Sequence, residues 1–324
     1  MPSATTELIG RLEKSVASAL VGKPAVVRLA VVGLLARGHL LIEDVPGVGK
    51  TTLAAALARS IGAAFQRIQF TSDMLPSDIL GVSIWDPEKH DFVFKPGPLF
   101  TNIVLADEIN RTTPKTQSSL LEAMNETQVS LDHSTYPLPR PFMVLATQNP
   151  LEYEGTHPLP ESQLDRFLLR IRIGYPGADD EKAILRSGMT MPSDGVAPVV
   201  SVEDVLHLQG LAERVRADES VLDYVMRLVA ATRTSPMLTL GVSPRGSLAL
   251  LRAARAHALA DGRDFLVPDD VKRLAVPALA HRVLVRARGF GNDGAHRVGG
   301  AAGPDATDAE AVVAAIVQDI PVPR

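Results

Sequence analysis

Residues 40–51 read Leu-Leu-Ile-Glu-Asp-Val-Pro-Gly-Val-Gly-Lys-Thr, and this stretch decides the fold. Its first three residues are apolar, as in a strand that is covered on both faces, and the Ala- and Leu-rich residues 52–60 are typical of a helix. Between the two, Gly47 and Gly49 lie directly before Lys50. A glycine-rich turn that joins a buried strand to a helix predicts a loop whose backbone N–H groups surround a phosphate group.

The residues of this loop predict how a nucleotide would be held. The ammonium group of Lys50 would neutralise oxygens of the β- and γ-phosphates, and the hydroxyl group of Thr51 would bind Mg²⁺. The backbone groups expected around the β-phosphate belong to the loop and the first helical turn, namely Gly47, Val48, Gly49 and Thr52. The sequence therefore predicts ATP and Mg²⁺ as cofactors.

Two further positions bear on this site. The standard pattern has a glycine six residues before the lysine, whereas this chain has Asp44 there. Upstream, Val21-Gly22 begins a segment that would either pack against the base of the nucleotide or simply start a helix, and the residues favour neither reading. Gly22 is the candidate contact for the base.

A second apolar run, residues 103–106, leads into the adjacent carboxylates Asp107 and Glu108, 57 residues after Lys50. Ligands of open α/β sheets bind at the carboxyl ends of the strands, where this pair would lie. Asp107 is expected to hold Mg²⁺ through its water shell, and Glu108 to polarise the attacking water. The alternative is a solvated pair at the end of a strand.

A third apolar run, residues 142–146, precedes Asn149. The amide of Asn149 would orient the water or contact the γ-phosphate, and the alternative is a local turn before Pro150. Further along, Arg166 follows Leu164-Asp165. An arginine from a neighbouring subunit can accelerate phosphoryl transfer by roughly 10³- to 10⁵-fold, which makes Arg166 the candidate arginine finger. The alternative for Arg166 is a contact with Asp165 or a surface ion pair.

Arg245 is the last candidate. Ser243 and Pro244 are typical of a helix start, with Ser243 as the N-cap. Cations are favoured at the other end of a helix, so Arg245 is expected to meet an anion, namely the nucleotide phosphates of its own subunit. The alternative is an ordinary surface arginine.

The order of the elements predicts an α/β core followed by helices. Five short strand-like runs, most of them apolar, lie at residues 39–43, 66–70, 103–107, 142–147 and 169–173 and alternate with helical stretches, which indicates a doubly wound parallel sheet. Residues 71–100 and about 127–141 interrupt this rhythm and read as inserted β-hairpins. We expect a core domain over residues 1–175, a helical lid over 176–290, and a flexible loop with a short docking helix over 291–324.

Composition narrows the class of protein. The formal net charge of -4 and the pI near 6.1 give no overall basic field, so nucleic-acid binding is not favoured. The absence of Cys excludes disulfides and thiolate catalysis and suits a reducing compartment, and we expect a cytoplasmic protein with no membrane-spanning helix. The eight His show no metal-ligand spacing, and we read Trp85, Phe92 and Phe94 as local packing rather than a client contact.

Taken together, these segments resemble the MoxR family of AAA+ ATPases over about residues 21–290. The resemblance is carried by Glu43 to Thr51, Asp107 to Arg111, Leu120 to Met124, Ala146 to Pro150, Leu164 to Phe167, and Ser243 to Arg245. It implies an insert in helix 2, which corresponds to residues 71–100, and ring hexamers. It also implies that Asn149 is sensor 1, that Arg166 is a trans-acting finger and that Arg245 is sensor 2.

The resemblance further implies a chaperone that matures or activates protein complexes or metal-containing enzymes, often with von Willebrand A-domain partners. Two other function classes stay open. One is a nucleotide-gated binding scaffold with little hydrolysis, and the other is a DNA-associated motor, which the acidic balance disfavours. A guanine-specific switch is not favoured, because no Asn-Lys-x-Asp segment is present.

Overall fold

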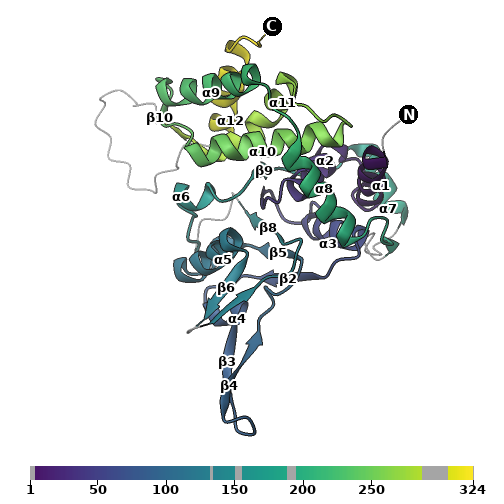
Figure 1. Ribbon diagram of the computed structural model, residues 1–324, viewed down its shortest axis with the longest axis vertical. Coiled ribbons are helices and arrows are strands. Elements are labelled where there is room, and N and C mark those ends of the chain that lie inside the picture. Colours follow the sequence, from purple (N-terminus) through teal and green to yellow (C-terminus); the bar gives the residue numbers. More distant parts are fainter. Residues whose placement is uncertain (1–3, 132–133, 150–154, 188–194, 287–305, 324) are drawn as a thin grey trace.

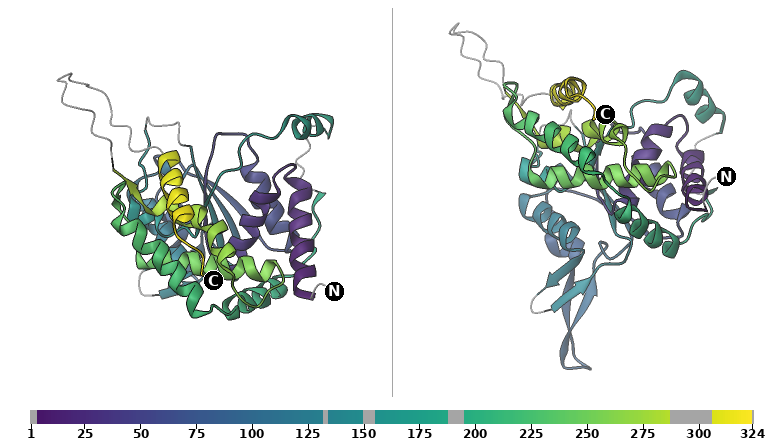
Figure 2. Two further views of the ribbon diagram at one scale, coloured as in Figure 1. Left: turned by 90° about the horizontal axis from the view of Figure 1, so that it is seen from above. Right: turned by 45° about the horizontal axis from the view of Figure 1, so that its top comes forward.

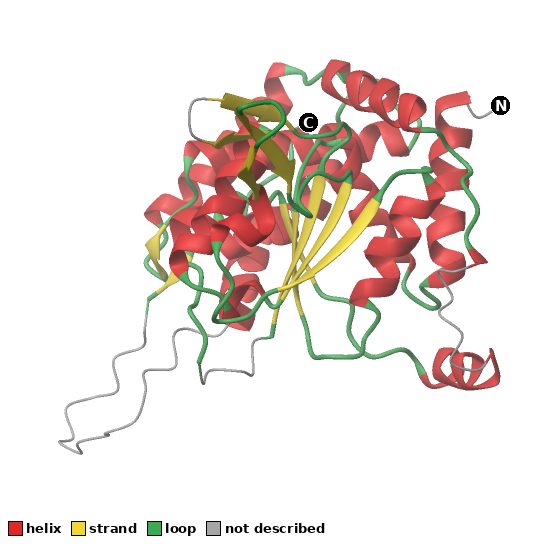
Figure 3. Cartoon of the chain, turned by 90° about the horizontal axis from the view of Figure 1, so that it is seen from below, coloured by secondary structure: helices red, strands yellow, loops and turns green. Residues whose placement is uncertain are grey.

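The computed structural model describes residues 4–131, 134–149, 155–187, 195–286 and 306–323. Its centre is a five-stranded parallel sheet in the order β2-β5-β8-β1-β9 (Figure 3). The strands are β1 (Leu40–Glu43), β2 (Phe65–Gln69), β5 (Ile103–Asp107), β8 (Met143–Gln148) and β9 (Leu169–Ile171). All five coincide with the strand-like runs of the sequence, which confirms the predicted parallel sheet.

Helices cover both faces of the sheet. On one face, Leu40 and Ile42 share a core with helices α1 (Ala4–Ala19), α2 (Pro24–Leu35) and α3 (Lys50–Ser60). On the other face, Leu41 packs in a second core with α5 (Pro114–Glu126) and the five-residue α4 (Pro76–Leu80). Because alternate residues of β1 enter different cores, its first three residues are all apolar.

The two predicted hairpins are confirmed and lie side by side. Strands β3 (Gly81–Asp86) and β4 (Asp91–Pro96) form a hairpin that projects from the body of the molecule (Figure 1). Strands β6 (Gln128–Leu131) and β7 (Ser134–Pro137) form the second, shorter hairpin. The Phe94 ring stacks on Tyr136, with centroids 3.9 Å apart, so the base of the long hairpin rests on the short one.

The second half of the chain is helical, as predicted. Helix α7 (Ala178–Ser187) follows the sheet, and the lid contains α8 (Val202–Arg214), α9 (Glu219–Thr234), α10 (Pro244–Ala260) and α11 (Pro268–Leu279). Short elements complete the described chain, namely η1 (Ile109–Arg111), α6 (Glu161–Leu164), β10 (Leu238–Leu240), η3 (Ala280–Arg282) and β11 (Leu284–Val285). The Ser201 side chain caps α8. Ser243 Oγ accepts the Gly246 N–H at 3.1 Å, so the helix start predicted at Ser243 is present.

The expected docking helix exists and is longer than the sequence indicated. Helix α12 (Ala306–Asp319) lies against α9, α11 and β11 (Figure 2). Most of the loop predicted before it falls outside the described residues. Buried side chains of the lid, such as Leu250 and Leu274, belong to the same core as α1–α3. In the described residues, no helix has both the length and the apolar character needed to cross a membrane.

Candidate nucleotide-binding site

The phosphate loop connects β1 to α3, as the sequence predicts. Gly47 and Gly49 have φ values of +83° and +101°, a conformation that side chains rarely adopt. A Cβ atom at Gly49 would lie 2.9 Å from a methyl group of Leu20, whereas one at Gly47 would meet open space. Helix α3 begins at Lys50 without a side-chain cap, so its first N–H groups remain for an anion.

Lys50 lies among the expected carboxylates. Its ammonium group donates a hydrogen bond to the carbonyl oxygen of Asp44. Burial lowers the pKa of Lys50, while the negative charges of Asp44, Asp107 and Glu108 act in the opposite direction. The loop and the end of β5 therefore form one electrostatic site, which suits a group carrying both phosphate and a cation.

The structure explains why an acid replaces the first glycine of the motif. Asp44 Oδ1 accepts the Val45 N–H at 2.9 Å, and Oδ2 accepts the N–H groups of Ile173 and Gly174 at 2.7 and 2.6 Å. Glycine could make none of these contacts. Asp44 thus fastens the entrance of the phosphate loop to the backbone where the chain leaves β9.

Asp107 is held from both neighbouring strands. Its Oδ1 accepts the Thr147 hydroxyl of β8 at 2.6 Å, and its Oδ2 accepts Arg67 Nη2 of β2, also at 2.6 Å. Thr147 Oγ1 in turn accepts the Glu108 N–H at 2.8 Å. Glu108 has φ +57°, so its side chain leaves the strand in a new direction. Thr147 therefore fixes the relative placement of both acids.

Glu108 is engaged by two side chains. Its Oε2 accepts Gln69 Nε2 at 2.6 Å and lies 3.0 Å from Arg111 Nε. Arg67, Gln69 and Thr147 were not predicted as site residues from the sequence. The available signal was the polar residues of β2, since Arg67 and Gln69 follow the alternation of a strand whose one side is wet.

The remaining candidates near the loop lie where the sheet order puts them. Asn149 follows β8, which lies between β5 and β1, so it stands between the carboxylates and the phosphate loop. Thr51 and Thr52 are half-buried in the first turn of α3. Gly22 has φ +76°, and a Cβ atom there would collide with the Asp180 carboxylate of α7. Gly22 thus permits α7 to approach the loop between α1 and α2.

Arg166 and Arg245 meet in a separate hollow of about 570 Å³. Arg166 Nη1 donates to the Leu121 carbonyl at 3.0 Å, and Arg245 Nη2 donates to Asn125 Oδ1 at 2.6 Å. The Asp165 carboxylate accepts Arg282 Nε at 2.7 Å and the Ser243 hydroxyl at 3.0 Å. Asp165 is therefore used to hold the lid, rather than to pair with Arg166.

This hollow lies at the amino ends of the parallel strands, whereas Lys50 lies at their carboxyl ends. Its lining includes His39, Phe142 and Leu168, each of which directly precedes a parallel strand, whereas the phosphate loop follows one. The structure thus does not bring Arg245 to the phosphate loop of its own chain, where it was expected to contact the nucleotide of the same subunit. The physical reason is lid docking, because α10 packs on α2 and α8 and carries Arg245 to the far edge.

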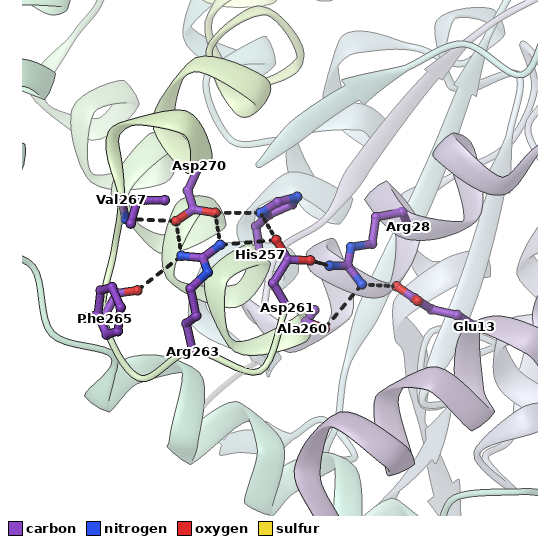
Figure 4. Close-up of polar contacts among 9 residues, drawn as sticks. All are labelled: Glu13, Arg28, His257, Ala260, Asp261, Arg263, Phe265, Val267 and Asp270. Atoms are coloured by element: carbon purple, nitrogen blue, oxygen red, sulfur yellow. Dashed lines mark hydrogen bonds and ion pairs between the residues drawn. The ribbon is translucent and has the colours of Figure 1, made fainter. Parts of the chain in front are cut away.

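A second ionic cluster connects the lid to α1 and α2 (Figure 4). His257, Asp261 and Asp270 offer ligand atoms within 4.8 Å of one another. Two guanidinium groups occupy their oxygens: both Asp270 oxygens accept Arg263 at 2.6 Å, and Asp261 pairs with Arg28, which also contacts Glu13 at 2.7 Å.

These arginines supply the positive charge that a metal ion would bring. Burial by itself would raise the pKa of Asp270, but hydrogen bonds from Arg263 and His257 hold it well below its usual value. The cluster is therefore an ionic clasp between the lid and the N-terminal helices.

Comparisons with known proteins agree with this geometry. Residues 39–169 match the family model described as "ATPase family associated with various cellular activities (AAA)", and residues 230–316 match an AAA lid domain. The chain is 44% identical to Chaperone MoxR1 of Mycobacterium tuberculosis over 82% of its length and 73% of that protein. It is 32% identical to Protein MoxR of Methylorubrum extorquens, covering 85% and 87% of the two chains.

Two further relatives extend the comparison over nearly the whole chain. The Bacillus subtilis protein YeaC, described as uncharacterized, is 52% identical over 86% of this chain and 87% of its own. A crystal structure of a candidate ATPase from Cytophaga hutchinsonii superposes with a TM-score of 0.85 at 35% identity, covering 99% of this chain and 96% of that one.

Proposed function

The chain belongs to the MoxR family of AAA+ ATPases, and from that premise we propose that it uses Mg²⁺-dependent ATP hydrolysis to assemble or activate a protein partner. ATP hydrolysis itself follows from the family. The chaperone role rests on the name of the Mycobacterium tuberculosis relative. A metalloenzyme or a von Willebrand A-domain protein is the partner class that we propose.

The residues of the loop would divide the chemistry among them. The N–H groups of α3 and the ammonium of Lys50 hold the β- and γ-phosphates, and Glu108 accepts a proton from the attacking water. Asn149 orients this water or the γ-phosphate. Thr51 and Asp107 offer the hard oxygen ligands that Mg²⁺ prefers, and the ion, when bound, neutralises charge on the phosphates. The hydrogen bond from Thr147 holds Asp107 in place at the end of β5.

We further propose that hydrolysis takes place between subunits of a homo-oligomeric ring, most simply a hexamer. Arg166 and Arg245 line the same hollow at the amino ends of the strands, away from the phosphate loop of their own chain. In a head-to-tail ring, that edge of one subunit meets the nucleotide edge of the next. Both arginines would then reach the neighbour's nucleotide, which revises the own-subunit role expected for Arg245.

We also propose a division of the chain near Tyr175. The nucleotide-binding core comprises residues 1–175, and the lid begins at residue 176. The two matched ranges support this division, and the lid match runs to residue 316, which extends the lid beyond residue 290 to include α12.

The observation that carries the proposal is the common site formed by Lys50, Asp107 and Glu108. The test is ATP turnover by wild-type protein and by Glu108→Gln, with nucleotide binding measured in parallel. We expect turnover to fall at least about 100-fold while binding persists, because the acceptor of the proton is lost. A wild-type protein that binds ATP and releases its partner without turnover would instead support the nucleotide-gated scaffold.

A further inference from the structure

Strand β9 carries a buried cation, Arg170, between two apolar neighbours. Leu169 and Ile171 point into the core shared with α1–α3, and Arg170 points to the other face of the sheet. Its side chain is only 6% exposed. A buried guanidinium must be paired and hydrogen-bonded to offset the loss of its hydration, so the partners of Arg170 show what it does.

These partners come from two distant parts of the chain. Arg170 Nη1 lies 3.2 Å from Glu43 Oε2 at the end of β1, and Nη2 lies 3.0 Å from Glu310 Oε1 of α12. The Glu43 side chain is 12% exposed and the Glu310 side chain 31%. A single planar guanidinium thus bridges the last lid helix and the strand that leads into the phosphate loop.

Glu43 is one residue away from the parts that position the phosphate. Its neighbour Asp44 holds the Lys50 ammonium through its carbonyl and the exit of β9 through its carboxylate. The backbone of Glu43 pairs with Gln148 of β8, directly before Asn149. Any movement of the Glu43 side chain is therefore expected to shift the start of the phosphate loop, which contacts Lys50 through Asp44 and lies beside Asn149 through the pairing with Gln148.

The charge of Glu43 also matters for an anionic ligand. With Arg170 removed, a nearly buried carboxylate would remain without that cation, close to the loop that binds phosphate groups. Such a charge repels phosphate and draws water or a proton into the site. With Glu310 neutralised instead, Arg170 would keep Glu43 but lose the contact that anchors it to α12.

We propose that Arg170 is a positioning residue for the nucleotide site, through which the lid helix α12 holds Glu43 and the entrance of the phosphate loop. The proposal rests on the proposed function only in that the loop binds ATP. It makes α12 part of the nucleotide site, although no side chain of α12 has to touch the ligand.

The test uses the full-length chain with Arg170→Met, Arg170→Lys and Glu310→Gln. Arg172→Gln is the matched control, because Arg172 is an exposed arginine whose Nη1 lies 3.5 Å from Oε2 of the same Glu310. Binding of a fluorescent ATP analogue and amide hydrogen exchange over residues 40–50 are measured for each variant. We expect nucleotide affinity to fall about tenfold in Arg170→Met and about threefold in Glu310→Gln, with Arg170→Lys in between and the control near wild type.

Turnover at saturating ATP should change less than about twofold in Glu310→Gln, since Asp107 and Glu108 keep their contacts, whereas KM should rise. Exchange over residues 40–50 should accelerate in the same variant. Faster exchange confined to α12, with unchanged affinity and unchanged exchange at residues 40–50, would overturn the proposal.

Misfolding of a variant and failure of the proposed function can both be distinguished from failure of this proposal. If Arg170→Met does not fold, the half-exposed Glu310 still decides the question through Glu310→Gln. A wild-type protein that binds ATP but does not hydrolyse it would contradict the proposed function and leave the binding and exchange readouts intact.

Discussion

At the scale of single residues, the contacts of Glu108 suggest that the catalytic carboxylate is restrained before ATP is hydrolysed. Gln69 and Arg111 both hold the same carboxylate oxygen. To act on a water molecule, the carboxylate has to give up part of this arrangement. We therefore expect the Gln69 contact to lower the basal rate of ATP hydrolysis.

The first prediction concerns this restraint. Gln69→Ala should raise basal ATP turnover about threefold, because one hydrogen bond to a charged group no longer has to be broken. Steady-state turnover at saturating ATP measures the effect. Gln66→Ala is the control and should leave the rate unchanged, because the Gln66 side chain lies on the same strand and donates to the backbone carbonyl of Arg67. A loss of turnover in Gln69→Ala would mean that Gln69 orients Glu108 productively.

His39 supplies a second prediction, about pH. It is buried directly before β1, where its Nδ1 accepts the Val144 N–H at 3.0 Å, so Nε2 carries the proton that is donated to the Met124 carbonyl. Burial lowers the pKa of His39 from 6.5 to about 4. Because the unfolded chain binds this proton more readily, stability contributed by neutral His39 is complete above pH 6.5 and is lost as the pH falls toward 4.

Denaturant unfolding between pH 7 and pH 4 measures this contribution, which should amount to about 3 kcal/mol. His39→Gln should be less stable at pH 7 but should show a flatter pH dependence in this range. An equally steep dependence in the variant would assign the effect to other groups.

The residue scale also shows what the sequence could predict. Lys50, Thr51 and Asp107 were found because a buried strand followed by a polar turn is a local pattern. Gln69 and Thr147 were not predicted, because each meets its carboxylate only through strand pairing across about 40 positions of sequence. The alternation of β2 marks Gln69 as polar and outward-facing, but it does not show which strand lies beside it. The position of Arg245, away from the phosphate loop of its own chain, could not be predicted because it depends on how the lid docks.

At the scale of elements, the long β3–β4 hairpin depends on the shorter hairpin beside it. Its outer part carries exposed Trp85 and Phe92, which contact one another edge to face. Its base is fixed by the stack of Phe94 on Tyr136 and by the contact of Phe94 with Phe100. The predicted local packing of the aromatic residues is thus correct for Phe94, and the other two rings pair mainly with each other.

A third prediction follows from this stack. Tyr136→Ala should lower the free energy of unfolding by about 1 kcal/mol more than the loss of buried apolar surface alone would, because the aromatic stack is lost. Amide exchange in residues 81–96 should accelerate, while ATP affinity stays unchanged. Exchange followed by mass spectrometry measures this. Tyr175→Ala removes a tyrosine ring that is 75% exposed and serves as the control. Unchanged exchange at residues 81–96 in Tyr136→Ala would show that the hairpin is held by other contacts.

At the scale of the whole molecule, the separation of the arginine hollow from the phosphate loop predicts complementation between subunits. Glu108→Gln and Arg245→Ala should each be nearly inactive alone. Mixed before assembly, they should recover activity, because roughly a quarter of the sites in a random mixed ring pair an intact Glu108 with a neighbour's intact Arg245.

Turnover of the mixture against protein concentration measures this recovery. Arg286→Ala, an exposed lid arginine next to β11, is the matched control and should be active alone. Mixtures that never exceed the sum of their components would place Arg245 outside the shared site.

The whole molecule also shows the limits of dividing it into parts. Residues 174–177, Gly-Tyr-Pro-Gly, form a linker-like stretch at the predicted boundary between the nucleotide core and the lid, yet Leu250 and Leu274 of the lid share one apolar core with α1–α3. Local composition marks the linker, but it carries no information on which faces of distant helices pack together. The clasp of Arg28, Asp261 and Glu13 adds charged contacts across the same boundary.

This shared core has a consequence for how such proteins can change over generations. Where two modules meet through a polar, hydrated boundary, recombination can exchange one module between relatives without harm. Here the side chains on both sides of the boundary fill a single close-packed volume, so a lid transplanted from a relative would meet helices shaped for another lid. The two parts are therefore expected to be inherited together, with substitutions on α2 matched by substitutions on α10.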